Sequence, residues 1–177
     1  MRRFERQPDG TLRAELDAEE ALLLQSLAGQ VSDVVASGIA LAGAVGAGDS
    51  GDEALSDPAV ARLLPDAYMD DPEASAEFRR FTVDTLIGRK LRNADVLIRS
   101  LDDAAEKGEG VVSLDGEAAQ AWLRSLTDIR LTIAARLGID SEDDDAGREA
   151  DPMMRDIYDW LGFVQNSLVE ALDDSHE

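Results

Sequence analysis

The chain has 177 residues, of which 44% are hydrophobic but only 5% aromatic, and its formal net charge at pH 7 is −21. A chain of this length can bury one hydrophobic core, so we expect residues 1–177 to form a single domain. The charge disfavours direct binding to DNA or to an anionic membrane, because repulsion opposes contacts with phosphate groups. The lack of cysteine excludes disulfides and thiolate metal sites.

The sequence shows neither a secretory signal nor a membrane span. Basic residues follow Met1, but no apolar run comes after them. The weakly polar stretch 34–48 is shorter than the roughly 20 apolar residues that a spanning helix needs. A cytoplasmic location is the simplest interpretation.

The first predicted elements are a β-hairpin and a long helix. Pro8-Asp9-Gly10 is a turn sequence between two short segments of alternating character, which predicts the hairpin. Asp17 and Glu20 have the spacing of a capping box, so a helix is expected from residue 18 to about 43. The glycines and acids of residues 43–57 indicate a flexible loop.

Two Asp-Pro pairs predict the next two helix starts. Asp57-Pro58 opens a short helix that Pro65 ends. Asp71-Pro72 opens the longest helix, which runs to about Lys107 and has a weak point at Gly88, since glycine costs about 1 kcal/mol relative to alanine.

The last third of the chain predicts one strand and two helices. Residues 111–114 suit a third strand, and Asp115 then caps a helix that Gly138 closes. Asp151-Pro152 opens the final helix, whose apolar stripe fits either the core or the seam of a homodimer. Residues 140–150 are expected to be an acidic linker and 173–177 a disordered tail.

These elements predict a mainly α fold. We expect about five helices in a bundle-like single domain, with a minor N-terminal β-hairpin or a small three-stranded sheet. Aromatic side chains on or beside the apolar stripes are expected to pack in the core rather than to stack on bases: Trp122, Tyr158, Trp160 and Phe163.

Residues 79–101 are the one basic stretch, with six basic residues against two acidic ones. A helical wheel places Arg79 and Lys90 on the apolar side of the long helix, and Arg130 on the apolar side of the next, with Asp128 turned away. A buried cation needs a partner, because its desolvation costs several kcal/mol. The candidate acids for a structural ion-pair network are Asp66, Glu77 and Asp84. An anion pocket is the alternative, although no glycine-rich phosphate loop accompanies it.

The opposite side of the long helix carries Arg89, Arg92 and Arg99, with Phe81 nearby. A solvated helix face is the simpler interpretation of these residues. The functional interpretation is a docking face for an acidic or aromatic surface of a protein partner.

The sequence predicts no catalytic, cofactor or metal site. His176 is the only histidine, and without cysteine it leaves no familiar nucleophile and base triad. The acidic runs lack the ligand spacing and central glycine of an EF-hand.

Three segments resemble an actinobacterial family of domains of unknown function that includes the oxidative-stress regulator AosR. The most specific block is Arg62-Leu63-Leu64-Pro65-Asp66-Ala67-Tyr68, and the segments span residues 57–68, 77–94 and 122–139. The resemblance continues to Tyr158-Asp159-Trp160-Leu161 and so covers nearly the whole chain. Arg79, Lys90 and Arg130 match the family's pattern.

The resemblance implies an intracellular helical protein, often encoded beside the proteolytic adaptor ClpS, with some members regulating transcription through a stress sigma factor. A cysteine pair is thought to sense oxidation in such regulators, and this chain has none. We therefore expect a non-enzymatic regulatory protein-interaction module whose partner is a sigma factor or another part of the transcription machinery. The alternatives are an accessory protein of ClpS-dependent proteolysis and a sensor of small anions or metabolites.

Overall fold

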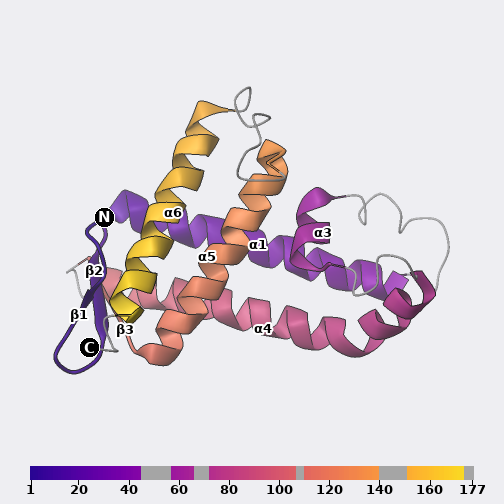
Figure 1. Ribbon diagram of the computed structural model, residues 1–177, viewed down its shortest axis with the longest axis horizontal. Helices are drawn as coiled ribbons and strands as arrows, with labels where there is room; N and C mark the ends of the chain where they lie inside the picture. Colours follow the sequence, from indigo (N-terminus) through magenta and orange to yellow (C-terminus); the bar gives the residue numbers. More distant parts are fainter. Residues whose placement is uncertain (45–56, 66–71, 107–109, 140–150, 174–177) are drawn as a thin grey trace.

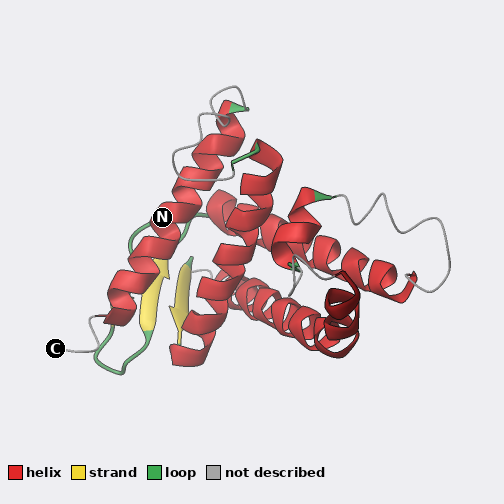
Figure 2. Ribbon diagram, turned by 45° about the vertical axis from the view of Figure 1, so that its right-hand side comes forward, coloured by secondary structure: helices red, strands yellow, loops and turns green. Residues whose placement is uncertain are grey.

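The computed structural model describes residues 1–44, 57–65, 72–106, 110–139 and 151–173, with the side chains of 38–44, 72–83 and 106 left out. This part of the chain contains five α-helices and one three-stranded antiparallel sheet (Figures 1 and 2). The elements in chain order are β1 (Glu5–Arg6), β2 (Leu12–Glu15), α1 (Ala18–Ala44), α3 (Pro58–Leu63), α4 (Pro72–Glu106), β3 (Val111–Leu114), α5 (Gly116–Leu137) and α6 (Pro152–Asp173). The predicted mainly α fold with a small three-stranded sheet is confirmed.

Aspartate caps start the helices where the sequence predicted them. Asp17 and Glu20 form the expected capping box, since each side chain accepts a 2.9 Å hydrogen bond from the other residue's backbone N–H. The carboxylates of Asp57, Asp115 and Asp151 accept backbone N–H bonds of 2.8 to 3.0 Å in the first turns of α3, α5 and α6. These caps fix where each helix enters the fold.

The sheet closes one end of the helical assembly. β2 lies in the middle and pairs antiparallel with both β1 and β3. Gly110 leads into β3 with a φ of 59°, and its carbonyl accepts a 2.8 Å bond from the N–H of Leu16. A Cβ at residue 110 would lie 2.7 Å from the Leu16 carbonyl oxygen, so only glycine fits at this crossing.

Helix α5 is the centre of the core. It packs against α4, α6, α3 and α1, and α1 lies along α4 (Figure 1). Trp122 of α5 is fully buried, and its ring meets the ring of Phe4 edge-on with centroids 5.8 Å apart. Leu161 and Leu168 of α6 are also fully buried, so the apolar stripe of the last helix belongs to the core.

One prediction about a particular residue is corrected. Phe163 is 38% exposed, because it lies on the outer side of α6, whereas Tyr158 and Trp160 pack against the core as expected. Helix α4 continues through Gly88 without a break. The segments predicted to be flexible, 43–57, 140–150 and 173–177, lie outside the described residues except at their ends.

None of the described helices is both long enough and apolar enough to cross a membrane.

Candidate functional site

The basic stretch predicted from sequence lies on α4 and presents its cations in two directions. Arg89, Arg92 and Arg99 are exposed, while the side chain of Lys90 is only 15% exposed. The predicted inward and outward orientations are therefore seen for these four residues.

Lys90 forms an ion pair with Asp128 of α5. Its Nζ lies 2.5 Å from Asp128 Oδ1, and the Asp128 side chain is only 9% exposed. Burial raises the pKa of Asp128 above its ordinary value, and the hydrogen bond and charge of Lys90 oppose that rise. The charge of Arg89 also favours the ionised carboxylate.

Asp128 was not among the acids expected to pair with Lys90. The helical wheel turned it away from the apolar side of its own helix, but α4 covers that other side as well. Asp84 is exposed, and Asp66 and the side chain of Glu77 lie outside the described part of the structure. The missed signal was the combination of an inward lysine and an acid on the neighbouring helix.

The side chains of Arg79 and Phe81 are also outside the described part. The place of Arg79 in an ion-pair network and the place of Phe81 beside the outward arginines stay predictions. That Asp66 and Glu77 belong to the ion-pair network also stays a prediction.

The outward arginines differ in what holds them. Arg99 Nη2 lies 2.8 Å from Asp95 Oδ2, one turn earlier in α4. Arg92 Nη1 lies over Gly88, 3.3 Å from the position that a Cβ there would take. Among the described residues, no acid lies within salt-bridge distance of Arg89 or Arg92, so these two charges are available to a partner.

Arg130 of α5 lies on the α6 side and is held by neutral groups. Its guanidinium carbon is 4.7 Å from the ring centroid of Tyr158, and its Nη1 donates a 2.9 Å hydrogen bond to Gln165 Oε1. Gln165 Nε2 in turn donates to Thr127 Oγ1 at 2.8 Å, which fixes the amide. Lys90 and Arg130 thus contact different neighbours of α5, and these two cations do not meet in one anion pocket.

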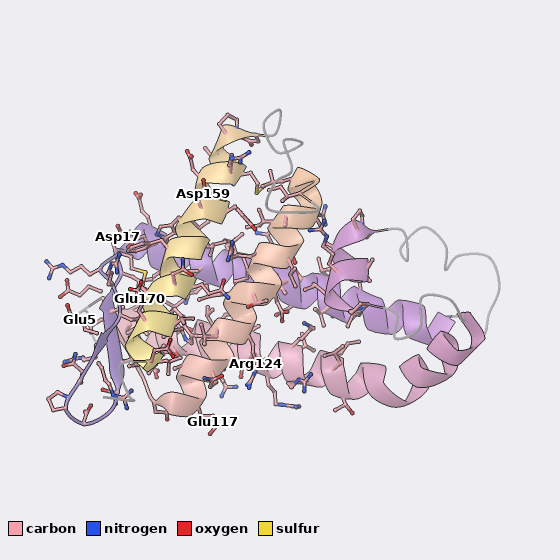
Figure 3. All side chains as sticks on the ribbon, viewed as in Figure 1. Glu5, Asp17, Glu117, Arg124, Asp159 and Glu170 are labelled. Carbon is pink, nitrogen blue, oxygen red and sulfur yellow. The ribbon has the colours of Figure 1, made fainter. Side chains whose placement is uncertain are left out.

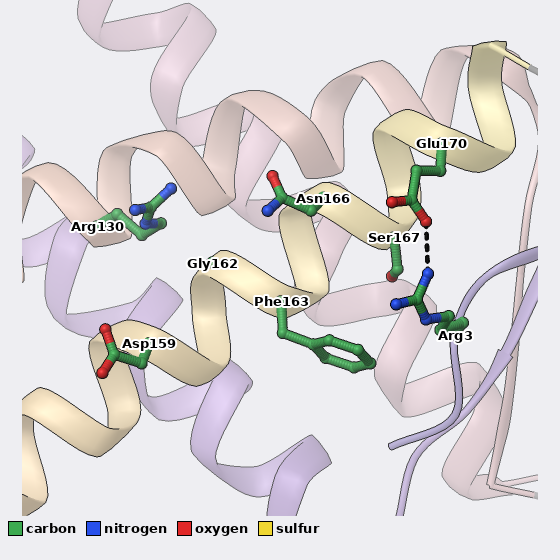
Figure 4. A pocket seen from close by; sticks show the side chains of 8 residues that line it. All are labelled: Arg3, Arg130, Asp159, Gly162, Phe163, Asn166, Ser167 and Glu170. Atoms are coloured by element: carbon green, nitrogen blue, oxygen red, sulfur yellow. Dashed lines mark hydrogen bonds and ion pairs between the residues drawn. The ribbon is translucent and has the colours of Figure 1, made fainter.

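A groove of about 370 Å³ lies along the outer side of α6. Its lining comes from the N-terminal arm, α5 and α6: Arg3, Arg130, Asp159, Gly162, Phe163, Asn166, Ser167 and Glu170 (Figure 4). Asp159 and Glu170 lie along α6, as Figure 3 also shows. Arg3 Nη1 lies 2.7 Å from Glu170 Oε2, and its guanidinium carbon lies 5.6 Å from the ring centroid of Phe163. We call this feature the α6 groove.

Sequence reasoning missed the α6 groove because it joins residues far apart in the chain. Arg3 was noted only as part of a basic N-terminus, and Phe163 only as a core aromatic. Within the described residues, no group of three or more His, Cys, Asp or Glu side chains could hold a metal ion.

Comparison with known proteins places the chain in a family. The sequence model of the family described as "Domain of unknown function (DUF2017)" matches residues 1–172. The chain belongs to this family. The resemblance inferred from its motifs is therefore confirmed.

One relative of this DUF2017 chain is a protein of Mycobacterium leprae (strain TN) named "Putative oxidative stress regulator AosR". The two are 30% identical over 127 residues, which cover 66% of this chain. The chain spans 58% of that relative's length. No solved structure matches the chain.

Proposed function

We propose that this protein is a non-enzymatic regulator of a stress response that acts by binding another protein through α4. The docking surface consists of Arg89 and Arg92, with Arg99 about two turns beyond Arg92, and we call it the α4 arginine face. The observation that carries the proposal is that Arg89 and Arg92 are exposed, with no acid of the described residues in salt-bridge reach, in a chain of net charge −21.

The chemistry of this face favours an acidic partner segment. Exposed guanidinium groups bind carboxylates with paired hydrogen bonds, and complementary charges speed association and set its orientation. The acidic remainder of the chain repels other acidic surfaces, so docking is directed to α4. Such a contact weakens with salt, because the exposed charges are screened.

The name of the relative and the family resemblance support a regulatory role in stress. They motivate a sigma factor or another part of the transcription machinery as the partner, in the cytoplasm. Direct contact with DNA is not part of the proposal, because the net charge opposes it.

Affinity purification from the native cells, followed by mass spectrometry, tests the proposal. The variant Arg89→Glu/Arg92→Glu is compared with Arg6→Glu/Arg13→Glu, which changes the charge equally at exposed positions of β1 and β2. We expect the wild type and the hairpin variant to recover a component of the transcription machinery, and the α4 variant to lose it. Equal recovery by both variants would contradict docking through α4.

The same experiment separates the rival roles. Recovery of protease or ClpS components, without transcription proteins, would favour an accessory role in proteolysis. Recovery of no companion protein would contradict the interaction module and favour a small-ligand sensor.

A further inference from the structure

The α6 groove is electrically balanced in a strongly acidic chain. Its lining contains two arginines and two acids, Arg3, Arg130, Asp159 and Glu170, whereas the whole chain carries −21. Two copies of this chain repel each other over most of their surfaces. A neutral patch with both signs of charge is where that repulsion is weakest.

Two charged side chains in the groove, Arg130 and Asp159, can pair with a charged group of another molecule. Arg3 and Glu170 already form an ion pair with each other. Arg130 is oriented by Tyr158 and Gln165, which carry no charge. Within the described residues, neither Arg130 nor the exposed Asp159 has an oppositely charged group in salt-bridge distance.

The groove has a gap at Gly162 and, next to it, a projecting side chain at Phe163. Gly162 has no side chain, and a Cβ there would touch the guanidinium of the half-buried Arg130 at 3.7 Å, so the glycine leaves a gap beside that cation. The neighbouring Phe163 projects from α6 and is 38% exposed (Figure 4). Val169, two turns beyond Gly162 on the same side of the helix, is 40% exposed.

We propose that the α6 groove binds a second copy of this chain in a two-fold symmetric dimer. In such a dimer each contact occurs twice, so Arg130 of each copy meets Asp159 of the other. Phe163 of each copy covers the gap at Gly162 of the other. This inference goes beyond the proposed function and uses none of the residues of the α4 arginine face.

A charge-reversal experiment with recombination of the variants tests the pairing. Sedimentation velocity of the full chain is measured over a wide concentration range for the wild type, Asp159→Arg, Arg130→Glu and an equimolar mixture of the two variants. Each variant alone places like charges opposite each other twice, so its dimerisation should weaken by roughly a hundredfold. The mixture restores opposite charges at both contacts and should dimerise nearly as well as the wild type.

Glu117→Arg provides the matched control for Asp159→Arg, because it reverses an exposed acid in the first turn of α5, outside the groove (Figure 3). It should dimerise like the wild type. Circular dichroism checks that Arg130→Glu still folds, and Phe163→Asp offers a second variant that leaves Arg130 in place. A wild type that stays monomeric overturns the proposal, as does a dimer that Asp159→Arg and Phe163→Asp leave intact. A mixture of folded variants that fails to dimerise overturns the pairing of Arg130 with Asp159.

Discussion

Arg89 and Lys90 are neighbours in α4 with the same charge, but their surroundings differ. Lys90 points to α5 and pairs with the buried Asp128, while Arg89 is exposed and has no acid of the described residues in salt-bridge distance. One basic stretch therefore supplies both a structural cation and a cation that a partner can reach. Local charge identifies the stretch, but burial decides which role each residue takes.

Arg130 adds a third environment. It is half-buried at the α6 groove, and a tyrosine ring and an amide hold it rather than a carboxylate. Removing Lys90 and removing Arg130 should therefore have different effects on stability, because only Lys90 offsets the burial of an acid.

Replacing Lys90 with methionine should have the largest effect. Asp128 would keep its buried carboxylate without the neighbouring ammonium, so we expect the free energy of unfolding to fall by about 3 kcal/mol. Urea denaturation measures this loss. Lys90→Met/Asp128→Leu is the control, since removing both charges together should recover most of the stability. A single variant as stable as the wild type would show that Lys90 does not compensate Asp128.

Replacing Arg130 with methionine should cost less. The change removes one hydrogen bond to Gln165 and the contact with the Tyr158 ring, so we expect a loss of about 1 kcal/mol. The same denaturation experiment gives the value. A loss as large as that of Lys90→Met would mean that Arg130 also offsets a buried charge.

Asp128→Asn tests whether burial or the charge of Lys90 has the stronger influence on the pKa of Asp128. At neutral pH we expect a smaller change in the free energy of unfolding than for the preceding variants, because asparagine has nearly the same shape as aspartate. Burial raises the folded-state pKa of Asp128 above its ordinary value of 3.8, so the folded state holds this proton more tightly than the unfolded state does. The resulting stability is present at acid pH and is lost as pH rises from 3.8 through the raised pKa. The stability of the wild type minus that of the variant should therefore fall over this range. A difference that rises with pH would mean that Lys90 outweighs burial.

The smallest effect on stability is expected for Arg89→Glu/Arg92→Glu. Both side chains are exposed, so the free energy of unfolding should change by no more than about 0.5 kcal/mol per substitution. Thermal unfolding monitored by circular dichroism checks this. A large loss of stability would mean that these arginines support the fold instead of forming a free surface.

Local chemistry in the sequence predicted most of the fold. Asp17, Asp115 and Gly138 act through neighbours within a few residues, so their capping roles were visible without tertiary structure. The strand at 111–114 was also predictable, because the alternation of buried and exposed positions in a strand can be recognised in the pattern of its residues.

The site was only partly predictable, because a helical wheel gives directions but not neighbours. It oriented Lys90 correctly, but it could not show that α4 covers the side of α5 that carries Asp128. The α6 groove depends on contact between Arg3 and Phe163, which are brought together only when the N-terminal arm reaches α6. No local sequence pattern predicts the contact between Arg3 and Phe163.

The distinction between structural cations and cations available to a partner can be tested most directly by capturing partners with two double variants in parallel. Lys90→Met/Asp128→Leu removes the buried pair, and Arg89→Glu/Arg92→Glu reverses the exposed charges. Purification from native cells should recover the partner with the first variant at the wild-type level and lose it with the second. Loss of the partner with the first, folded variant and its retention with the second would contradict the account.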